Sequence, residues 1–165
     1  MFGFESSWLK RVVKELVDLE HSSYNVQPYH NNNADLSHLE ASLPIPSGTP
    51  YSGGTYTIDI RIPASYPFEK PAMKFNAKIW YPNVHQETGE IAPGALGSWD
   101  PTDTIKTILD SIVKLLLQPD TQHPLNEEAN TEFLEVPADF AEMAQEWAIK
   151  YAGALRFVSS FSSSF

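Results

Sequence analysis

Hydrophobic residues recur at helical spacing in several separate stretches of this chain. Residues 7–20 carry an apolar stripe with Ser7 suited to cap the helix, and the stripe consists of Leu9, Val12, Val13, Leu16 and Leu19. Residues 104–117 show a wider apolar face, which predicts a buried central helix that ends at Pro119. Shorter helices are predicted over residues 126–134 and after Pro137.

Between the first two predicted helices the pattern changes to alternation. Residues 56–62 alternate apolar and polar, which predicts a strand with one buried and one solvated face; the apolar positions are Tyr56, Ile58, Ile60 and Ile62. A further strand is predicted around residues 73–75, and residues 36–43 could form another. The polar segment 25–35 is expected to be loop and turn. This order predicts an α+β fold, with an antiparallel meander sheet and helices at its ends and across one face.

Residues 81–100 show no periodicity and are punctuated by proline and glycine. A loop of this length within one domain is usually functional or disordered. Trp80 and Trp99 flank the segment, which favours a packed loop.

Length and composition indicate one globular domain. The chain has 165 residues, of which 42% are hydrophobic and 19% charged. We expect residues 1–156 to form the domain and the serine-rich residues 157–165 to fray. No apolar run approaches the ~20 residues that span a bilayer, and no signal-peptide pattern opens the chain. The expected compartment is therefore the cytoplasm or the nucleus.

The charge pattern and the absence of cysteine exclude several functions. A net charge of −10 argues against nucleic-acid binding. Lys10, Arg11 and Lys14 lie mostly off the apolar stripe, so they form either an exposed basic patch for a partner or an ordinary solvated face. Without cysteine there is no disulfide and no thiol chemistry. No metal or cofactor is expected, because no ligand-like spacing links His21, His30, His38, His85 and His123.

Five short motifs follow one another in a fixed order. They are Tyr66-Pro67-Phe68 with Pro71, Lys78 to Asn83, Thr88 to Ile91, Trp99 with Pro101, and Gln118-Pro119 to Asn126. In this order and spacing the chain resembles the ubiquitin-conjugating enzymes, across roughly residues 7–152. The resemblance implies a four-stranded antiparallel meander sheet, an N-terminal helix, a central helix and two C-terminal helices. Motifs typical of other hydrolases and phosphate-binding proteins are absent.

In that family a cysteine accepts ubiquitin or a related modifier as a thioester from an activating enzyme. The cysteine then passes the acyl group to a ligase or to a substrate lysine. By resemblance, the nucleophile position is Ala92, nine residues after Asn83. A methyl group cannot carry an acyl group, so the chain as given should not charge. By the same resemblance, Asn83 either holds the adjacent loop or donates a hydrogen bond to the developing oxyanion.

Other positions depart from the family pattern. His123 stands where many members have aspartate; it could act as a base near neutral pH, serve transfer to ligase cysteines, or be a structural loop residue. Tyr81 replaces a histidine and can still donate a hydrogen bond, and Lys70 replaces a proline. Pro93-Gly94 replaces the usual Leu-Asp, and the run from Ala92 to Trp99 is one residue short.

These departures leave two interpretations open. One is a conjugating enzyme whose cysteine has been replaced by alanine, which the persistence of Asn83 and Trp99 favours. The other is a natural inactive variant that binds ubiquitin or a partner, which the altered Pro93-Gly94 loop favours.

Partner surfaces can also be carried over from the resemblance. Phe68, Pro101 and Thr102 match the patch that docks RING-type or HECT-type ligases, with a buried Phe68 as the alternative. Lys10, Arg11 and Lys14 match the helix that meets the activating enzyme. Neither a nucleic acid nor a membrane is expected as a partner.

Overall fold

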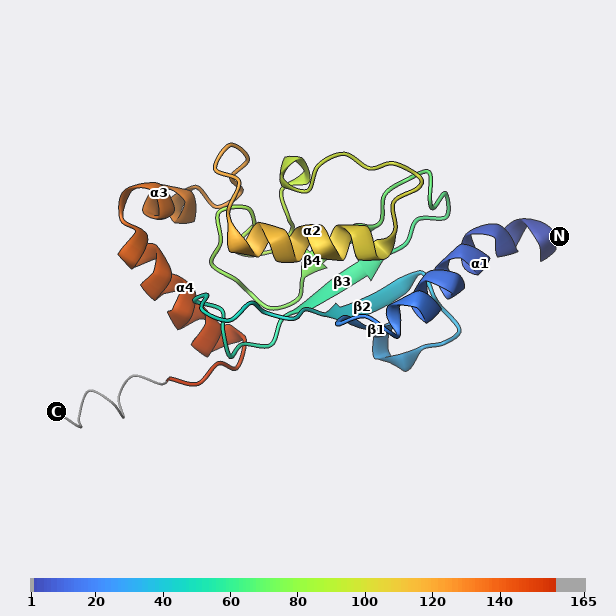
Figure 1. Ribbon diagram of the computed structural model, residues 1–165, viewed down its shortest axis with the longest axis horizontal. Helices are drawn as coiled ribbons and strands as arrows, with labels where there is room; N and C mark the ends of the chain where they lie inside the picture. Colours follow the sequence, from blue (N-terminus) through green and yellow to red (C-terminus); the bar gives the residue numbers. More distant parts are fainter. Residues whose placement is uncertain (1, 157–165) are drawn as a thin grey trace.

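The computed structural model describes residues 2–156, and the side chains from residue 7 onward (Figure 1). The expected fraying of residues 157–165 lies outside the described residues. The helices and strands follow in the order α1 (Phe2–Leu19), β1 (Asn25–Pro28), the 3-10 turn η1 (Tyr29–Asn31), β2 (His38–Ser42), β3 (Thr57–Arg61), β4 (Ala72–Phe75), the 3-10 turn η2 (Pro93–Ala95), α2 (Ile105–Leu117), α3 (Glu127–Glu135) and α4 (Pro137–Tyr151).

The four strands form one antiparallel sheet in the order β1-β2-β3-β4, which confirms the predicted α+β meander. Residue pairs such as Ala41 with Ile58, and Ile60 with Met73, fix the register. In Figure 1, α2 crosses one face of the sheet, α1 lies at one end, and α3 and α4 lie at the other. None of the helices within residues 2–156 combines the length and the apolar character that crossing a bilayer would need.

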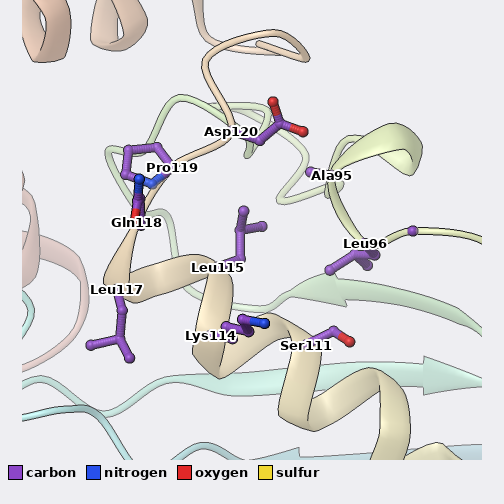
Figure 2. Close-up of a pocket in the computed structure, with 10 residues that line it drawn as sticks. Ala95, Leu96, Ser111, Lys114, Leu115, Leu117, Gln118, Pro119 and Asp120 are labelled. Carbon is purple, nitrogen blue, oxygen red and sulfur yellow. The ribbon is translucent and has the colours of Figure 1, made fainter.

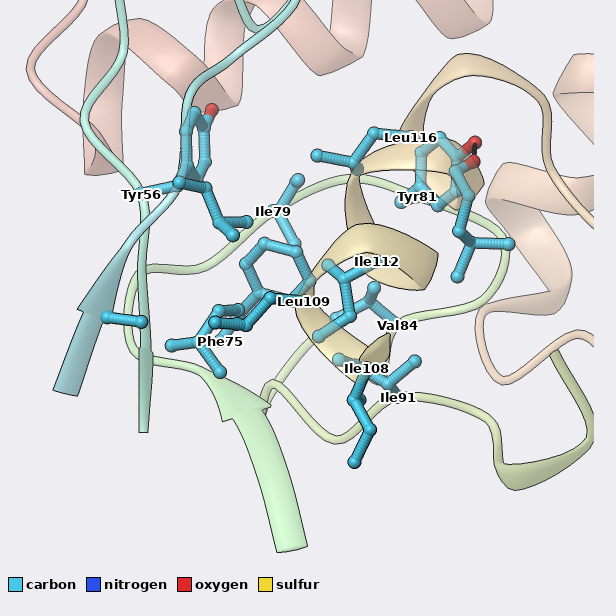
Figure 3. Packing of buried hydrophobic residues seen from close by; sticks show 14 of the residues in the cluster. Tyr56, Phe75, Ile79, Tyr81, Val84, Ile91, Ile108, Leu109, Ile112 and Leu116 are labelled. Carbon is cyan, nitrogen blue, oxygen red and sulfur yellow. Dashed lines mark hydrogen bonds between the residues drawn. The ribbon is translucent and has the colours of Figure 1, made fainter. Parts of the chain in front are cut away.

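The core lies between α2 and the sheet, and it continues under the long loop. The apolar face of α2 is buried as its spacing predicted, with Ile105, Leu109 and Ile112 completely covered. Figure 3 shows this face packed against side chains from β4 and from the loop that follows it, including Phe75, Ile79, Tyr81, Val84 and Ile91. The loop therefore contributes to the core itself, which explains how a segment without periodicity can be ordered.

Two predicted element boundaries were wrong. The first helix begins at Phe2, so Ser7 lies inside it instead of capping it. The segment 25–35 is not all loop, because Asn25–Pro28 forms the edge strand β1 and Tyr29–Asn31 forms a 3-10 turn. β1 is polar and only half-buried, and it is held by its backbone pairing with β2. The strand alternates exposed and half-buried residues, but over only four residues, so the pattern is too short to stand out, and Pro28 is tolerated at the sheet edge.

The apolar stripe predicted for α1 is narrower in the structure. Val12 and Leu19 are buried, whereas Leu9 and Val13 are exposed by 36% and 43%. The helix packs against β1 and α2 and reaches the loops at Tyr66 and Asp103 through Glu15 and Arg11, so one seam of its surface faces the protein. That seam passes through Glu15, which is buried between Val12 and Leu19.

The solvated face predicted for β3 is also partly wrong. Asp59 is buried, because His38 of β2 lies against it with 2.5 Å between Nε2 and Oδ1. Arg61 Nε lies 3.3 Å from the other carboxylate oxygen. Both neighbours cover the carboxylate and offer it hydrogen bonds, so the polar residue remains paired.

Candidate functional site

The loop after β4 folds back and forms a small extension of the sheet. The Phe75 N–H donates to the Gly89 carbonyl over 2.9 Å, and isolated bridges join Lys74 to Glu90 and Val84 to Ile91. Gly89 has a φ of 80°, and a Cβ at this position would overlap the Phe75 carbonyl oxygen. The glycine of this motif is therefore required by backbone geometry, and it lets the chain lead directly to Ala92.

Hydrogen bonds of both its N–H and its carbonyl group hold Ala92 in place. Its N–H donates to the Asn83 carbonyl over 2.8 Å, and its carbonyl accepts from the Ala95 N–H over 3.0 Å, which begins η2. Only 3% of the residue is exposed. The expected nucleophile position is thus a rigid turn residue whose side chain is an unreactive, largely covered methyl group.

Asn83 is completely buried, and its side chain holds the loop between α2 and α3. Its Nδ2 donates to the Asp120 carbonyl over 2.7 Å and to the His123 carbonyl over 2.9 Å. Its Oδ1 accepts from the Asp120 N–H over 2.9 Å. Both amide hydrogens are occupied, so this arrangement fits the loop-holding role. A hydrogen bond to an oxyanion would need one of these contacts to open.

The loop that Asn83 holds presents His123 to the turn that follows Ala92. The imidazole packs directly on Gly94, where a Cβ would lie 2.8 Å from Nε2. The other ring nitrogen, Nδ1, lies 2.7 Å from Oδ2 of Asp120. This hydrogen bond lowers the pKa of Asp120 below its ordinary value, with a further contribution from the Gln122 N–H. The structure therefore brings Asn83, Ala92 and His123 together at one loop junction.

Two cavities flank the turn. One, of about 670 Å³, lies between the turn and the C-terminal end of α2; Figure 2 shows Leu115 projecting toward Ala95 and Leu96, with Asp120 at the rim. The other, of about 490 Å³, is lined by Lys70, Ile91, Pro93 and Leu125, among others. Burial lowers the pKa of Lys70.

Tyr81 donates a structural hydrogen bond, as expected from its sequence position. Its hydroxyl donates to the Leu115 carbonyl at the end of α2. Burial raises its pKa well above the ordinary value, so the phenol stays neutral. The neighbouring Trp80 packs on Trp147 of α4, with 5.0 Å between ring centroids. These contacts anchor the start of the site loop to α2 and α4.

The expected ligase patch is exposed. Phe68 is 79% exposed, so the alternative of a buried phenylalanine was wrong. Pro101 and Thr102 are exposed on the neighbouring loop. Trp99 joins the two loops, since its Nε1 donates to the Pro67 carbonyl over 2.7 Å. The three side chains therefore lie on linked loops that project an aromatic ring to the solvent.

The expected activating-enzyme patch is only partly free. Lys10 and Lys14 are exposed, and Lys14 pairs loosely with Asp18 over 3.3 Å. Arg11 is half-buried: its Nε donates to Glu15 over 2.9 Å and one terminal nitrogen donates to the Asp103 carbonyl over 2.6 Å. The hydrogen bond with Glu15 is the main cause that raises its pKa. The expectation that all three cations are available to a partner was therefore wrong for Arg11.

Sequence reasoning missed Glu15, which connects three parts of the molecule. One carboxylate oxygen accepts from the Tyr66 hydroxyl over 2.6 Å, and the other accepts from the Ile105 N–H over 2.8 Å. Glu15 thus joins α1 to the start of α2 and to the loop that carries Phe68. A signal was present, because Glu15 interrupts the apolar stripe three residues after Val12.

Comparison with known proteins agrees with this geometry. The family model described as ubiquitin-conjugating enzyme matches residues 9–148. The chain belongs to the ubiquitin-conjugating enzyme family. The matched segment runs from α1 to α4 and includes the whole candidate site.

Curated relatives and solved structures support the same family. Ubiquitin-conjugating enzyme E2 1 of Schizosaccharomyces pombe is 37% identical over 146 residues, 88% of this chain and 67% of that protein. Ubiquitin-conjugating enzyme E2 27 of Arabidopsis thaliana is 37% identical over 147 residues, 86% of this chain and 75% of that protein. The E2 domain of a Toxoplasma gondii ubiquitin conjugating enzyme superposes with a TM-score of 0.79 at 35% identity, covering 87% of this chain and 98% of that one.

Proposed function

We propose that this chain is a ubiquitin-conjugating enzyme by scaffold and partner surfaces, in which Ala92 replaces the cysteine that would accept the modifier from an activating enzyme and pass it to a ligase or a substrate lysine, so that the chain as given does not charge. One observation carries the proposal. The position that the motifs assign to the nucleophile is an alanine held rigidly between Asn83 and Ala95, in a chain with no cysteine anywhere. The backbone hydrogen bonds of Ala92 and the buried Asn83 beside it support the reading in which the scaffold lacks only the thiol.

The chemistry of charging explains why one atom decides the outcome. In a conjugating enzyme the cysteine thiolate attacks the carbonyl carbon of the modifier's thioester on the activating enzyme. A new sulfur–carbon bond forms and the thiol of the activating enzyme leaves. The methyl group of Ala92 has no lone pair for this attack and no leaving-group chemistry for the second transfer.

The partner surfaces support retained binding. Phe68, Pro101 and Thr102 form an exposed patch on linked loops, which suits a transient interface with a RING-type or HECT-type ligase. On α1 the exposed Lys10 and Lys14 give a positive face for the activating enzyme, and Arg11 acts from within by holding the helix to the loop before α2.

A second candidate is a binding module that has lost charging for good. The favouring observation is that Ala92 is only 3% exposed, and that Pro93-Gly94 and a shortened connection follow it. In this reading the cover over residue 92 would also exclude a thiol from attack. The two candidates differ in what a restored cysteine would do.

The test is a charging assay with activating enzyme, ATP and a panel of ubiquitin-like modifiers. We expect no product with the chain as it stands and a product removed by reducing agent with Ala92→Cys. Because the chain has no other cysteine, Ala34→Cys is a matched control that places one thiol in an exposed loop far along the sequence. If Ala92→Cys folds and stays uncharged, conjugation is refuted and the binding-module reading replaces it.

A further inference from the structure

Lys70 is a half-buried lysine that forms no ion pair within residues 7–156. The other half-buried lysine of this part of the chain, Lys78, pairs with Glu87 over 3.4 Å. Lys70 lines the cavity of about 490 Å³, whose wall is mostly apolar and includes Met73, Ile91, Pro93 and Leu125, with Glu90 as its single acid. The amine therefore lies against hydrophobic side chains and lacks the carboxylate partner that a buried lysine usually has.

These surroundings change the chemistry of the amine. Burial lowers the pKa of Lys70, and no carboxylate of the described chain raises it again through an ion pair. A larger share of the amine is then uncharged near neutral pH, and an uncharged amine has the lone pair that a nucleophile needs. Lys74 of β4 is a natural comparison, because it lies four residues further along the chain and is exposed.

The loop that carries Lys70 also carries part of the ligase patch. Phe68, which is 79% exposed, precedes Lys70 by two residues, so their Cα atoms lie within about 7 Å of each other. The loop is held on both sides of this pair, since the Pro67 carbonyl accepts from Trp99 Nε1 over 2.7 Å and Pro71 is buried. A partner that contacts Phe68 therefore comes close to an amine that is partly open to solvent.

We propose that Lys70 is a covalent acceptor site, whose amine takes the modifier from the thioester of a HECT-type ligase docked on the patch of Phe68, Pro101 and Thr102. A ligase of the HECT type suits this step because it carries the modifier on its own cysteine. The inference rests on the proposed function for the docking of the ligase, whereas the reactivity of the amine is independent of it.

The proposed step is an aminolysis of the thioester. The lone pair of Nζ attacks the carbonyl carbon of the modifier, and a nitrogen–carbon bond forms. The carbon–sulfur bond breaks, and the sulfur leaves as the thiolate of the ligase. The proton that the nitrogen loses passes to the solvent. The product is an amide, and no sulfur atom of this chain takes part in its formation.

The reactivity of the amine is tested without any partner. The chain is treated with a limiting amount of a small acetyl thioester near pH 7.5, and the acetylation of each lysine is measured by mass mapping of peptides. We expect Lys70 to react at least about threefold faster than Lys74. The advantage should shrink as pH rises toward the ordinary lysine pKa, because exposed amines then lose their proton as well. Equal rates at Lys70 and Lys74 near neutral pH would overturn the proposal.

The transfer is tested with a HECT-type ligase that has been charged with ubiquitin and then separated from the activating enzyme, the charging conjugating enzyme and ATP. We expect a product that survives reducing agent and carries ubiquitin on the Lys70 peptide. Lys70→Arg, which keeps the positive charge, should lower the yield at least about tenfold, and the matched Lys74→Arg should leave it unchanged. Phe68→Ala should also lower it about tenfold while acetylation of Lys70 stays the same. Ubiquitin spread evenly over the exposed lysines would contradict the site.

The outcomes separate this inference from the proposed function. If the ligase binds the chain in a titration and leaves Lys70 unmodified, the acceptor site is wrong and the docking role stands. If the ligase does not bind, docking fails and the acceptor site fails with it. The charging of Ala92→Cys is a distinct result, because reducing agent removes that thioester and leaves the amide on Lys70 intact.

Discussion

Asn83→Ala is the substitution that most directly tests how the site loop is held. The buried amide makes three side-chain hydrogen bonds to the loop between α2 and α3. Two of the loop groups, the Asp120 N–H and the His123 carbonyl, have no other partner among the bonds within residues 2–156. The Asp120 carbonyl keeps one bond, from the His123 N–H over 3.3 Å.

The expected cost follows from these two orphaned groups. An unsatisfied buried donor or acceptor costs about 1–3 kcal/mol, and the partly exposed loop lets water relieve some of this. We expect the free energy of unfolding to fall by about 2–3 kcal/mol. For a domain of this size each kcal/mol lowers Tm by about 2–4 °C, so Tm should drop by roughly 4–12 °C.

Asn83→Asp sharpens the test because it keeps the shape and changes only the chemistry. The new oxygen would face two carbonyl oxygens where the amide nitrogen donates to both. At pH 7 it should destabilise at least as strongly as Asn83→Ala. Burial raises the pKa of a carboxyl group there, so its protonated form is favoured in the folded chain. The loss of unfolding free energy caused by Asn83→Asp should therefore become smaller as pH falls and larger as pH rises.

Thermal and urea unfolding, with amide hydrogen exchange at Asp120, measure these effects. Asn33→Ala is a matched control, since Asn33 is exposed and makes only a backbone hydrogen bond among the described residues. The control should lie within about 0.5 kcal/mol of the parent chain. An Asn83→Ala chain with unchanged Tm and unchanged exchange at Asp120 would refute the reasoning, because the loop would then be held by something else.

Three further predictions follow from other contacts. Glu15→Ala should lower the free energy of unfolding in urea by about 3 kcal/mol, because it leaves the Tyr66 hydroxyl and the Ile105 N–H without their acceptor. Glu20→Ala, at an exposed position, should change it by almost nothing. Equal effects of the two substitutions would contradict the role of Glu15 in joining the elements. Phe68→Ala should leave Tm within about 1 °C, since the ring is 79% exposed, and weaken ligase binding about tenfold in a titration; unchanged affinity would remove Phe68 from the interface. The carboxyl NMR titration of Asp120 should show a pKa below the ordinary value that rises in His123→Ala. The pair's stabilisation is then present above the unfolded pKa and is lost as pH falls through the lowered native value; an unmoved titration would show that His123 is not the cause.

The sequence predicted correctly those elements in which burial against the core determines the spacing of the hydrophobic residues. α2 is buried along one face, and its 3.6-residue spacing revealed this directly. β1 was missed because it has only four residues, whose alternation is too short to be read from the sequence, and it is held largely by backbone pairing with β2. α1 was assigned too broad an apolar face, since the sequence cannot show that only one seam of the helix meets the protein.

The candidate site shows the same division. Asn83, Ala92 and His123 were placed by motif and spacing, and the structure brings them to one loop junction. What the sequence could not show is which groups each side chain contacts. Arg11 was counted as a free cation and is largely engaged with Glu15 and Asp103. Nothing in the sequence was a reason to select Asp120, because aspartate is common in turns. Only the structure shows that the imidazole of His123 lies beside it.

The division of α1 into two faces has an evolutionary consequence. Its inner seam, with Val12, Glu15 and Leu19, is constrained by contacts with the rest of the fold. Its outer face is exposed and makes few contacts that stabilise the fold; it consists of Lys10, Val13, Lys14 and Val17. Mutations can therefore accumulate on the outer face at little risk to folding. A duplicated copy could drift toward a new partner there, and a protein engineer could rewrite the same four positions to build an orthogonal pair.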